Sequence, residues 1–211
     1  MGIAERRERE KEQRRNAIID AAEKVFFSQR LEHATMDDVA EEAELSKGTL
    51  YLYFKSKEEL YLAIHLRGNI ILKKMFEDAV ARYERGIEKV RAVGQAYMDF
   101  YQKYPDYFHA MIYYESRAFD YKDADSIAVQ CVEMGKSTLD ILINAIEYGK
   151  QDGSIRPDID AKKTAISLWG QSTGIIQIIA LKEFILIQNH EIKSEEIVDY
   201  TFELIYHSLK A

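Results

Sequence analysis

A run of hydrogen-bond donors between Leu45 and Lys57 contains the residues of this sequence best suited to binding chemistry. Its charged residues are Lys47, Lys55 and Lys57, and it contains no acidic side chain. Ammonium and hydroxyl groups donate to phosphate oxygens, which together with sugars receive half or more of protein–DNA hydrogen bonds. Gly48 costs roughly 1 kcal/mol relative to alanine in a helix, so its presence indicates close approach of a phosphate or base edge. The run predicts a DNA-contacting surface.

Two short helices are expected to position these donors. Three potential N-caps, Thr35, Ser46 and Ser56, lie close together, and Thr35 and Ser56 are each followed three residues later by a carboxylate, as in a capping box. They predict one helix over residues 36–43, a tight connection, and a second helix that ends at residue 53. Two short helices joined in this way form a helix-turn-helix.

The second short helix has one apolar face and one polar face. Leu50 and Phe54 are four residues apart and should pack inward against the first short helix, at Met36, Val39 and Ala40. The opposite face consists of Lys47, Gly48, Thr49, Tyr51 and Tyr53.

This stretch resembles the DNA-binding signature of the TetR (TetR/AcrR-like) family of bacterial transcriptional repressors, T-x-x-x-I/V-A…S-K-G-x-L-Y-x-Y/H-F-x-x-K-x-x-L. The matching residues are Thr35, Val39, Ala40, Ser46, Lys47, Gly48, Thr49, Leu50, Tyr51, Tyr53, Phe54, Lys57 and Leu60. The resemblance covers roughly the first sixty-five residues. It implies a homodimer that binds a palindromic double-stranded DNA operator and is released by a small-molecule effector.

The resemblance also assigns DNA contacts within the signature. Gly48 and Thr49 are expected nearest the base edges, where Thr49 could touch a thymine methyl group. Phosphate contacts are expected from Thr35, Ser46, Lys47, Tyr51, Tyr53 and Lys57.

Composition and periodicity predict an all-α chain of about nine helices. The 211 residues include two prolines and ten glycines, and long stretches keep helical spacing of apolar residues. We assign residues 1–55 to a DNA-binding domain and residues 56–211 to ligand binding and dimerisation. The remaining helices are expected at 5–30, 57–83, 87–104, 106–117, 126–150, from a cap at Asp160 to 188, and 194–207, with a break at Gly86 and a loop over 119–125.

The formal net charge of −7 argues at first sight against nucleic acid as a partner. Positive charge is nevertheless concentrated near the N-terminus. Glutamates interleave with it, so two interpretations stay open: a DNA-contacting arm, or a solvated helix with local ion pairs. The basic residues of this arm are Arg6, Arg7, Arg9, Lys11, Arg14 and Arg15.

Aromatic residues and methionines are dense between residues 97 and 134. A core explains each one individually, but buried tyrosine hydroxyls need partners, and apolar walls with a few hydroxyls suit a small apolar or aromatic ligand. In the TetR family the effector occupies this region. The expected ligand-binding residues are Tyr97, Tyr101, Phe108, Met111, Met134, Trp169, Thr173 and Gln177.

The eighth helix contains Gly170 and Gly174, whose spacing allows close approach of another helix. The resemblance implies that helices eight and nine of two subunits form a four-helix bundle; the alternative is that the glycines accommodate the preceding helix of the same chain. Residues 165–187 approach the length of a membrane span, but polar residues such as Gln177 and Lys182 interrupt them. No membrane partner is expected.

Other function classes have little support in the sequence. The five histidines are scattered, Cys131 has no basic neighbour in sequence, and phosphate-binding loops and nucleophile elbows are missing. We expect no enzyme activity, metal or cofactor, and the charged N-terminus with a single cysteine indicates a cytoplasmic protein. The alternative to a repressor is a helical interaction or small-molecule-binding protein without specific DNA binding.

Overall fold

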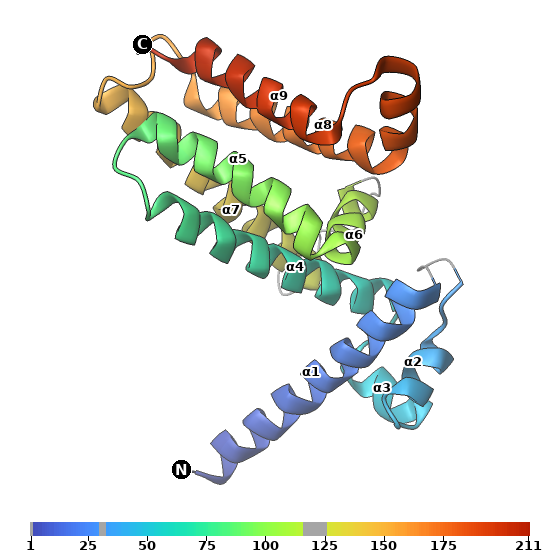
Figure 1. The fold of residues 1–211 in the computed structure, drawn as a ribbon. Coiled ribbons are helices and arrows are strands. Elements are labelled where there is room, and N and C mark those ends of the chain that lie inside the picture. Colours follow the sequence, from blue (N-terminus) through green and yellow to red (C-terminus); the bar gives the residue numbers. More distant parts are fainter. Residues whose placement is uncertain (1, 30–32, 116–125) are drawn as a thin grey trace. The chain divides into compact units, whose positions relative to one another are not determined.

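The computed structural model describes residues 2–29, 33–115 and 126–211, which are helical apart from turns and one isolated bridge between Ile155 and Lys210 (Figure 1). The all-α prediction is confirmed. The helices are α1 (Ile3–Gln29), α2 (Met36–Glu42), α3 (Lys47–Tyr53), α4 (Lys57–Val80), α5 (Gly86–Lys103), α6 (Pro105–Glu115), α7 (Ile127–Gln151), α8 (Ala161–His190) and α9 (Ser194–Leu209). The predicted loop over 119–125 lies outside the described residues.

The chain forms two compact units. The first unit comprises residues up to 68 together with 106–132, and the second comprises 69–105 and 133–211. Helix α4 is one continuous helix that contributes its first half to the first unit and its second half to the second.

The first unit is built around the apolar face of α1. Ile18, Ala22 and Val25 are buried together with Leu50 of α3 and the α2 residues that were expected to face it. Helix α6 also belongs to this unit, because the Tyr61 hydroxyl donates to the Ala110 carbonyl at 2.5 Å.

A polar cluster joins α1, α4 and α6 within the first unit. Arg67 forms ion pairs with Asp20 at 2.6 Å and Glu23 at 2.9 Å, and the Tyr107 hydroxyl donates to Glu23 at 2.6 Å. A Cβ on Gly68 would lie 3.0 Å from the Tyr107 ring, so this glycine makes room for α6. Gly68 therefore has a packing function in an unbroken α4.

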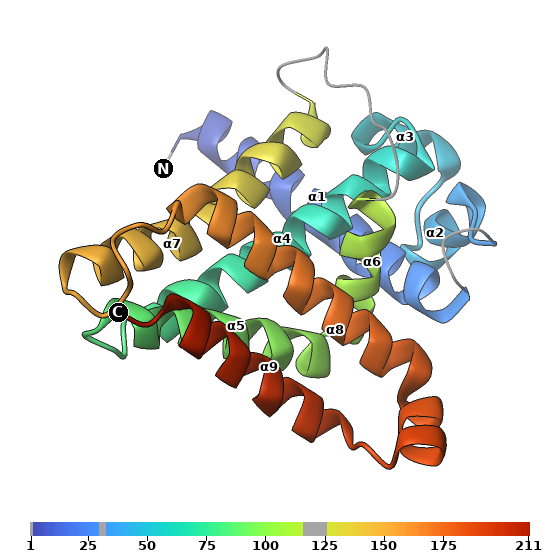
Figure 2. The same ribbon diagram turned by 90° about the horizontal axis from the view of Figure 1, so that it is seen from above.

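In the second unit, α9 runs alongside α5 and α8 (Figures 1 and 2). The break expected at Gly86 is present between α4 and α5, and α5 begins at Gly86, one residue before the predicted start at residue 87. An ideal Cβ there would lie 2.1 Å from the Gly149 amide nitrogen of α7, so only glycine permits this backbone contact. The turn after α7 also caps α5, since Asp152 accepts from the Gly86 amide at 2.7 Å and Ser154 from the Ile87 amide at 3.1 Å.

Helix ends differ from the predicted bounds by a few residues. The clearest case is α4, which ends at Val80 and not at residue 83. Arg82 and Tyr83 donate to carbonyls three residues back, so the last turn tightens and the regular helix stops earlier.

His65 lies in α4 within the first unit and is 3% exposed. Burial lowers its pKa from the ordinary 6.5 to about 4, because charging the ring without water is unfavourable.

We predict that acid weakens the fold through His65. Between pH 6.5 and 4 the unfolded chain binds a proton at His65 that the folded chain does not. The free energy of unfolding is therefore unaffected by His65 above pH 6.5 and falls by roughly 3 kcal/mol as the pH is lowered to 4. Urea unfolding across this range would measure the slope. His65→Gln should flatten the slope; an unchanged slope in this variant would contradict the prediction.

Candidate nucleic-acid interface and effector region

Helix α2 begins with the predicted capping box. Thr35 donates its amide to Asp38 at 2.8 Å, and its hydroxyl oxygen accepts from the Asp38 amide at 3.2 Å. Hydrogen bonds from the Thr35 side chain and amide lower the pKa of the Asp38 carboxyl. The cap fixes the start of α2, so the Thr35 side chain has a structural function as well as its expected phosphate contact.

Ser46 performs the same function for α3. Its hydroxyl oxygen accepts from the Thr49 amide at 3.2 Å and lies 2.9 Å from the Thr49 hydroxyl oxygen. The two hydroxyls that the sequence placed at the interface are therefore adjacent on the first turn of α3. Leu50 and Phe54 are fully buried, so the opposite face of α3 is directed outward.

Gly48 has open space around it. A Cβ at this position would have the Ser46 hydroxyl oxygen, at 3.9 Å, as its sole neighbour within 4 Å among the described residues. No contact within the described chain demands a glycine here, in contrast to Gly86. A requirement for glycine would therefore have to come from an external partner.

The lysines of the interface are already engaged in local contacts. Lys47 forms an ion pair with Asp37 at 2.5 Å, with both side chains more than half exposed, and hydrogen bonding to Asp37 raises the pKa of Lys47. Lys57 donates to the Ala34 carbonyl at 3.0 Å and thereby ties the start of α4 to the start of α2. A phosphate at Lys47 would compete with Asp37 for the ammonium group.

The two tyrosines of the α3 face, the set Lys47, Gly48, Thr49, Tyr51 and Tyr53 predicted from the sequence, differ in exposure. Tyr51 is 48% exposed, whereas Tyr53 is partly buried and packs against the core of the first unit, because it lies only three residues from Leu50. Sequence reasoning missed Leu52, which at 83% exposed is the most exposed large apolar side chain on this helix. Its place two residues after the inward-facing Leu50 was the available signal.

In the second unit, Tyr97 and Thr173 come together from α5 and α8. Their side-chain oxygens are 3.0 Å apart, Tyr97 is 5% exposed, and its ring packs edge-on against Phe76. The buried hydroxyl thus has the partner that its position demands.

The other predicted ligand-binding residues are distributed over both units. Tyr101, Met134 and Gln177 are partly buried on α5, α7 and α8 of the second unit, and Trp169 is 41% exposed on α8. Phe108 and Met111 are buried on α6 of the first unit.

Cys131 does not have the surroundings of a reactive thiol. It is 2% exposed, donates weakly to the Leu62 carbonyl at 3.4 Å, and has its pKa raised to about 12 by burial. Among the residues that the structure describes, no group of three or more His, Cys, Asp or Glu side chains could hold a metal ion.

Helices α8 and α9 expose an apolar surface, the α8–α9 surface. The segment from Ala161 to Lys182 is long and apolar enough by composition to cross a membrane, with mean hydropathy 1.2, yet only 22% of it is buried. A Cβ on Gly170 or Gly174 would meet no described atom within 4 Å, so these glycines do not accommodate another described helix of the same chain. The large exposed side chains are Ile166, Trp169, Ile178, Leu181, Tyr200 and Leu204.

Two family models match the sequence. The model of bacterial regulatory proteins of the tetR family matches residues 18–64, and that of the tetracyclin repressor-like C-terminal domain matches residues 90–204. The first match includes α2 and α3.

Curated relatives share both short and long stretches. The uncharacterized HTH-type transcriptional regulator YhgD of Bacillus subtilis is 32% identical over 149 residues, which cover 68% of this chain and 73% of YhgD. The HTH-type transcriptional activator FasR of Mycolicibacterium smegmatis is 34% identical over 90 residues, 43% of this chain and only 41% of FasR. The HTH-type transcriptional repressor KstR2 of the same species is 26% identical over 156 residues, 70% of each chain.

Solved structures share the fold at low identity. A Rhodococcus sp. RHA1 protein of unknown function has a TM-score of 0.76 at 21% identity, covering 94% of this chain and 95% of its own. FadR from Bacillus subtilis, in complex with stearoyl-CoA, has a TM-score of 0.67 at 18% identity, and the match covers 91% of this chain and 97% of the FadR chain. AibR, in complex with isovaleryl coenzyme A and operator DNA, has a TM-score of 0.67 at 20% identity, and the match covers 92% of this chain and 98% of the AibR chain.

We predict that Gly48→Ala separates stability from DNA affinity. Alanine fits the open space and restricts the unfolded chain, so the free energy of unfolding should rise by about 0.4–1 kcal/mol. The added methyl group would occupy the path of a phosphate or base edge, so DNA affinity should fall about tenfold, or 1.4 kcal/mol.

The matched control is Gly135→Ala in α7, where a Cβ also meets no described atom within 4 Å. This variant should gain stability and keep its DNA affinity. Equal DNA affinity of Gly48→Ala and the wild type would mean that the α3 face does not approach DNA closely at this residue.

Proposed function

The chain belongs to the tetR family of bacterial regulatory proteins, and from this premise we propose that it is a cytoplasmic repressor that binds a palindromic DNA operator as a homodimer and leaves it when a small effector binds. Residues 1–55 bind DNA, and residues 56–211 bind the effector and form the dimer. No catalytic step is part of the proposal.

The observation that carries this proposal is the α3 face. It presents the exposed Lys47 and Tyr51 and the partly exposed Thr49 around a glycine that the described chain does not itself require. Phosphate contacts from Thr35, Ser46, Lys47, Tyr51, Tyr53 and Lys57 would orient the helix, and Gly48 and Thr49 would lie at base edges.

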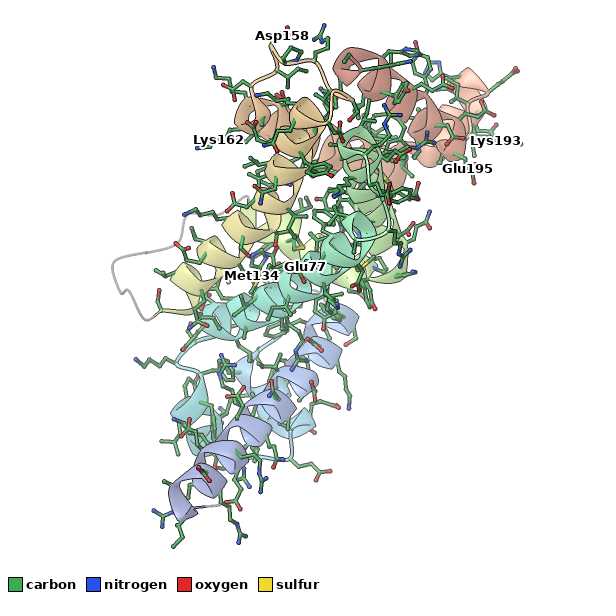
Figure 3. All side chains as sticks on the ribbon, turned by 90° about the vertical axis from the view of Figure 1, so that its left-hand side faces the viewer. Glu77, Met134, Asp158, Lys162, Lys193 and Glu195 are labelled. Atoms are coloured by element: carbon green, nitrogen blue, oxygen red, sulfur yellow. The ribbon has the colours of Figure 1, made fainter. Side chains whose placement is uncertain are left out.

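Dimerisation is proposed through the α8–α9 surface. Exposed apolar patches of this kind mark interaction sites, and Gly170 and Gly174 leave space for close helix approach. Charged residues lie at both ends of the helix pair, Asp158 and Lys162 at one end and Lys193 and Glu195 at the other (Figure 3). The exposed Lys182, Asp199 and Glu203 also lie along α8 and α9, and charges among the apolar side chains suit a protein partner better than a bilayer.

We predict that the protein is a dimer in solution and that Gly174→Phe shifts it towards monomer. The bulky ring fills the space that a partner helix would occupy, while the position is open in the single chain. Light scattering with circular dichroism would measure mass and helicity. Gly135→Phe, at an equally open position of α7, should remain dimeric. A monomeric wild type at tens of micromolar would exclude this interface.

An acyl-coenzyme A thioester is the proposed effector class. Support comes from FadR and AibR, whose folds resemble this one and which were solved with stearoyl-CoA and isovaleryl coenzyme A. The effector region consists of Tyr97, Tyr101, Met134, Trp169, Thr173 and Gln177 in the second unit. The inclusion of Phe108 and Met111 of the first unit stays a prediction from the sequence.

Helix α4 is the proposed route from effector to DNA. It begins at Lys57 beside the cap of α2 and continues without interruption into the second unit, where Phe76 contacts Tyr97. Palindromic binding requires two α3 helices at a fixed spacing, so a small movement of α4 would misalign them.

We predict that an acyl-CoA lowers operator affinity 5- to 150-fold, which corresponds to a coupling of about 1–3 kcal/mol. Fluorescence anisotropy with free coenzyme A, a short-chain and a long-chain acyl-CoA would test this, after a footprint has located the operator. By reciprocity, saturating operator must weaken acyl-CoA binding by the same factor.

Tyr97→Phe, which removes the hydroxyl beside Thr173, should lower the affinity for the effector about fivefold. Tyr148→Phe, at an exposed site of α7, should leave this affinity unchanged. If no DNA sequence gives a footprint, the repressor proposal fails. If an acyl-CoA binds and operator affinity stays constant, the effector assignment fails while DNA binding stands.

A further inference from the structure

The N-terminal part of α1 is a long helical arm that no core residue secures. The first buried residue of α1 is Ile18, and nearly all residues before it are exposed. From Ile3 to Ile18 the helix spans about 22 Å at 1.5 Å per residue. In Figures 1 and 3 the N-terminal end of this helix extends past α2 and α3. A helix segment that is polar all round needs ion pairs or a partner to be stable.

The arm carries a basic stripe, Arg7, Lys11 and Arg14. With 3.6 residues per turn, these three side chains lie within about 60° of one another around the helix axis. The four glutamates of the arm lie about 70° or more from the middle of the stripe, with Glu10 nearest to it. The mixed charge of the sequence is therefore sorted by face in the helix.

Three of the four glutamates have hydrogen-bond partners outside the stripe. Glu5 accepts from the Gly2 amide at 2.9 Å, Glu10 pairs with Arg6 at 2.7 Å, and Glu12 accepts from Asn16 at 3.2 Å. Within the stripe, Arg7 and Lys11 are like charges at i and i+4, which destabilises an isolated helix slightly. Such an arrangement is compensated when an anionic partner covers it.

The stripe continues the face by which α1 packs on the first unit. Ile18, Ala22 and Val25 lie on the same side of the helix and are buried with α2 and α3. Between the stripe and this core, the Arg15 guanidinium lies 5.0 Å from the centre of the Phe54 ring, at the C-terminal end of α3. The stripe is therefore on the side of α1 where α3 lies, and it begins where α3 ends.

We propose that the basic stripe binds the phosphate backbone of the same DNA duplex that the α3 face contacts, and so extends the interface beyond the groove that α3 enters. This inference rests on the proposed DNA binding. The charge of the stripe identifies the partner. Its three cations lie in line over about 10 Å, and the closely spaced phosphates of a DNA duplex form a matching row of negative charges.

The test compares two double variants of equal charge, Arg7→Gln/Arg14→Gln on the stripe and Arg6→Gln/Arg9→Gln off it. Each phosphate contact contributes about 0.9 to the slope of log affinity against log salt, so four contacts in a dimer amount to about 3.6. In the stripe variant the slope of log affinity against log salt should become shallower by about that amount. The same variant should no longer protect the DNA positions that flank each half-site in a hydroxyl-radical footprint. The off-stripe variant should keep both.

An equal loss of salt slope in the two variants would mean that the arm acts only as a diffuse positive charge. No loss of slope in either variant would mean that the arm does not contact DNA, and either result overturns the inference. Circular dichroism checks that the arm stays helical. The slopes are also measured on a random-sequence duplex, so the stripe is judged even if no operator exists. A missing operator footprint counts against the repressor proposal alone.

Discussion

The burial of Leu50 and Phe54 is the constraint on which the rest of the first unit depends. A helix of seven residues is too short to be stable in water, so α3 exists only because these side chains are enclosed by α1, α2 and α4. The same enclosure decides which face of α3 is directed outward. Loosening that core would therefore disturb the α3 face before any residue on it is changed.

Helix α6 is tied to the same unit by groups that are costly to separate. Arg67, Glu23 and Tyr107 form a partly buried cluster, and removing one member would leave a charge or hydroxyl without its partner. Through this cluster, α6 is fixed to the packing of α1, on which α2 and α3 rest. Any ligand that acts on α6 would act on α2 and α3 by way of α1, in addition to the proposed route through α4.

Local sequence was sufficient to predict the caps, the two short helices and the all-α fold, because Thr35, Ser46 and Asp160 satisfy amides only three residues away. It located the break near Gly86 but not the reason for this glycine, which is the close contact with the Gly149 backbone of α7. The placement of α6 in one unit with α1, α2 and α3 and the exposure of Leu52 likewise depend on tertiary packing. The ligand-binding residues stay predictions, since a list of aromatic residues does not specify which of them enclose a common space.

The cap of α5 has a consequence for the order of folding. Helix α5 begins without a side-chain cap of its own, and its first amides are satisfied by Asp152 and Ser154, 66 and 67 residues along the chain. Closing a loop of that length costs chain entropy before the contact returns any free energy. The start of α5 therefore depends on contacts that are distant in sequence, which form more slowly than the local caps of α2 and α3. During synthesis from the N-terminus, α2 and α3 can form well before α5 acquires its first turn.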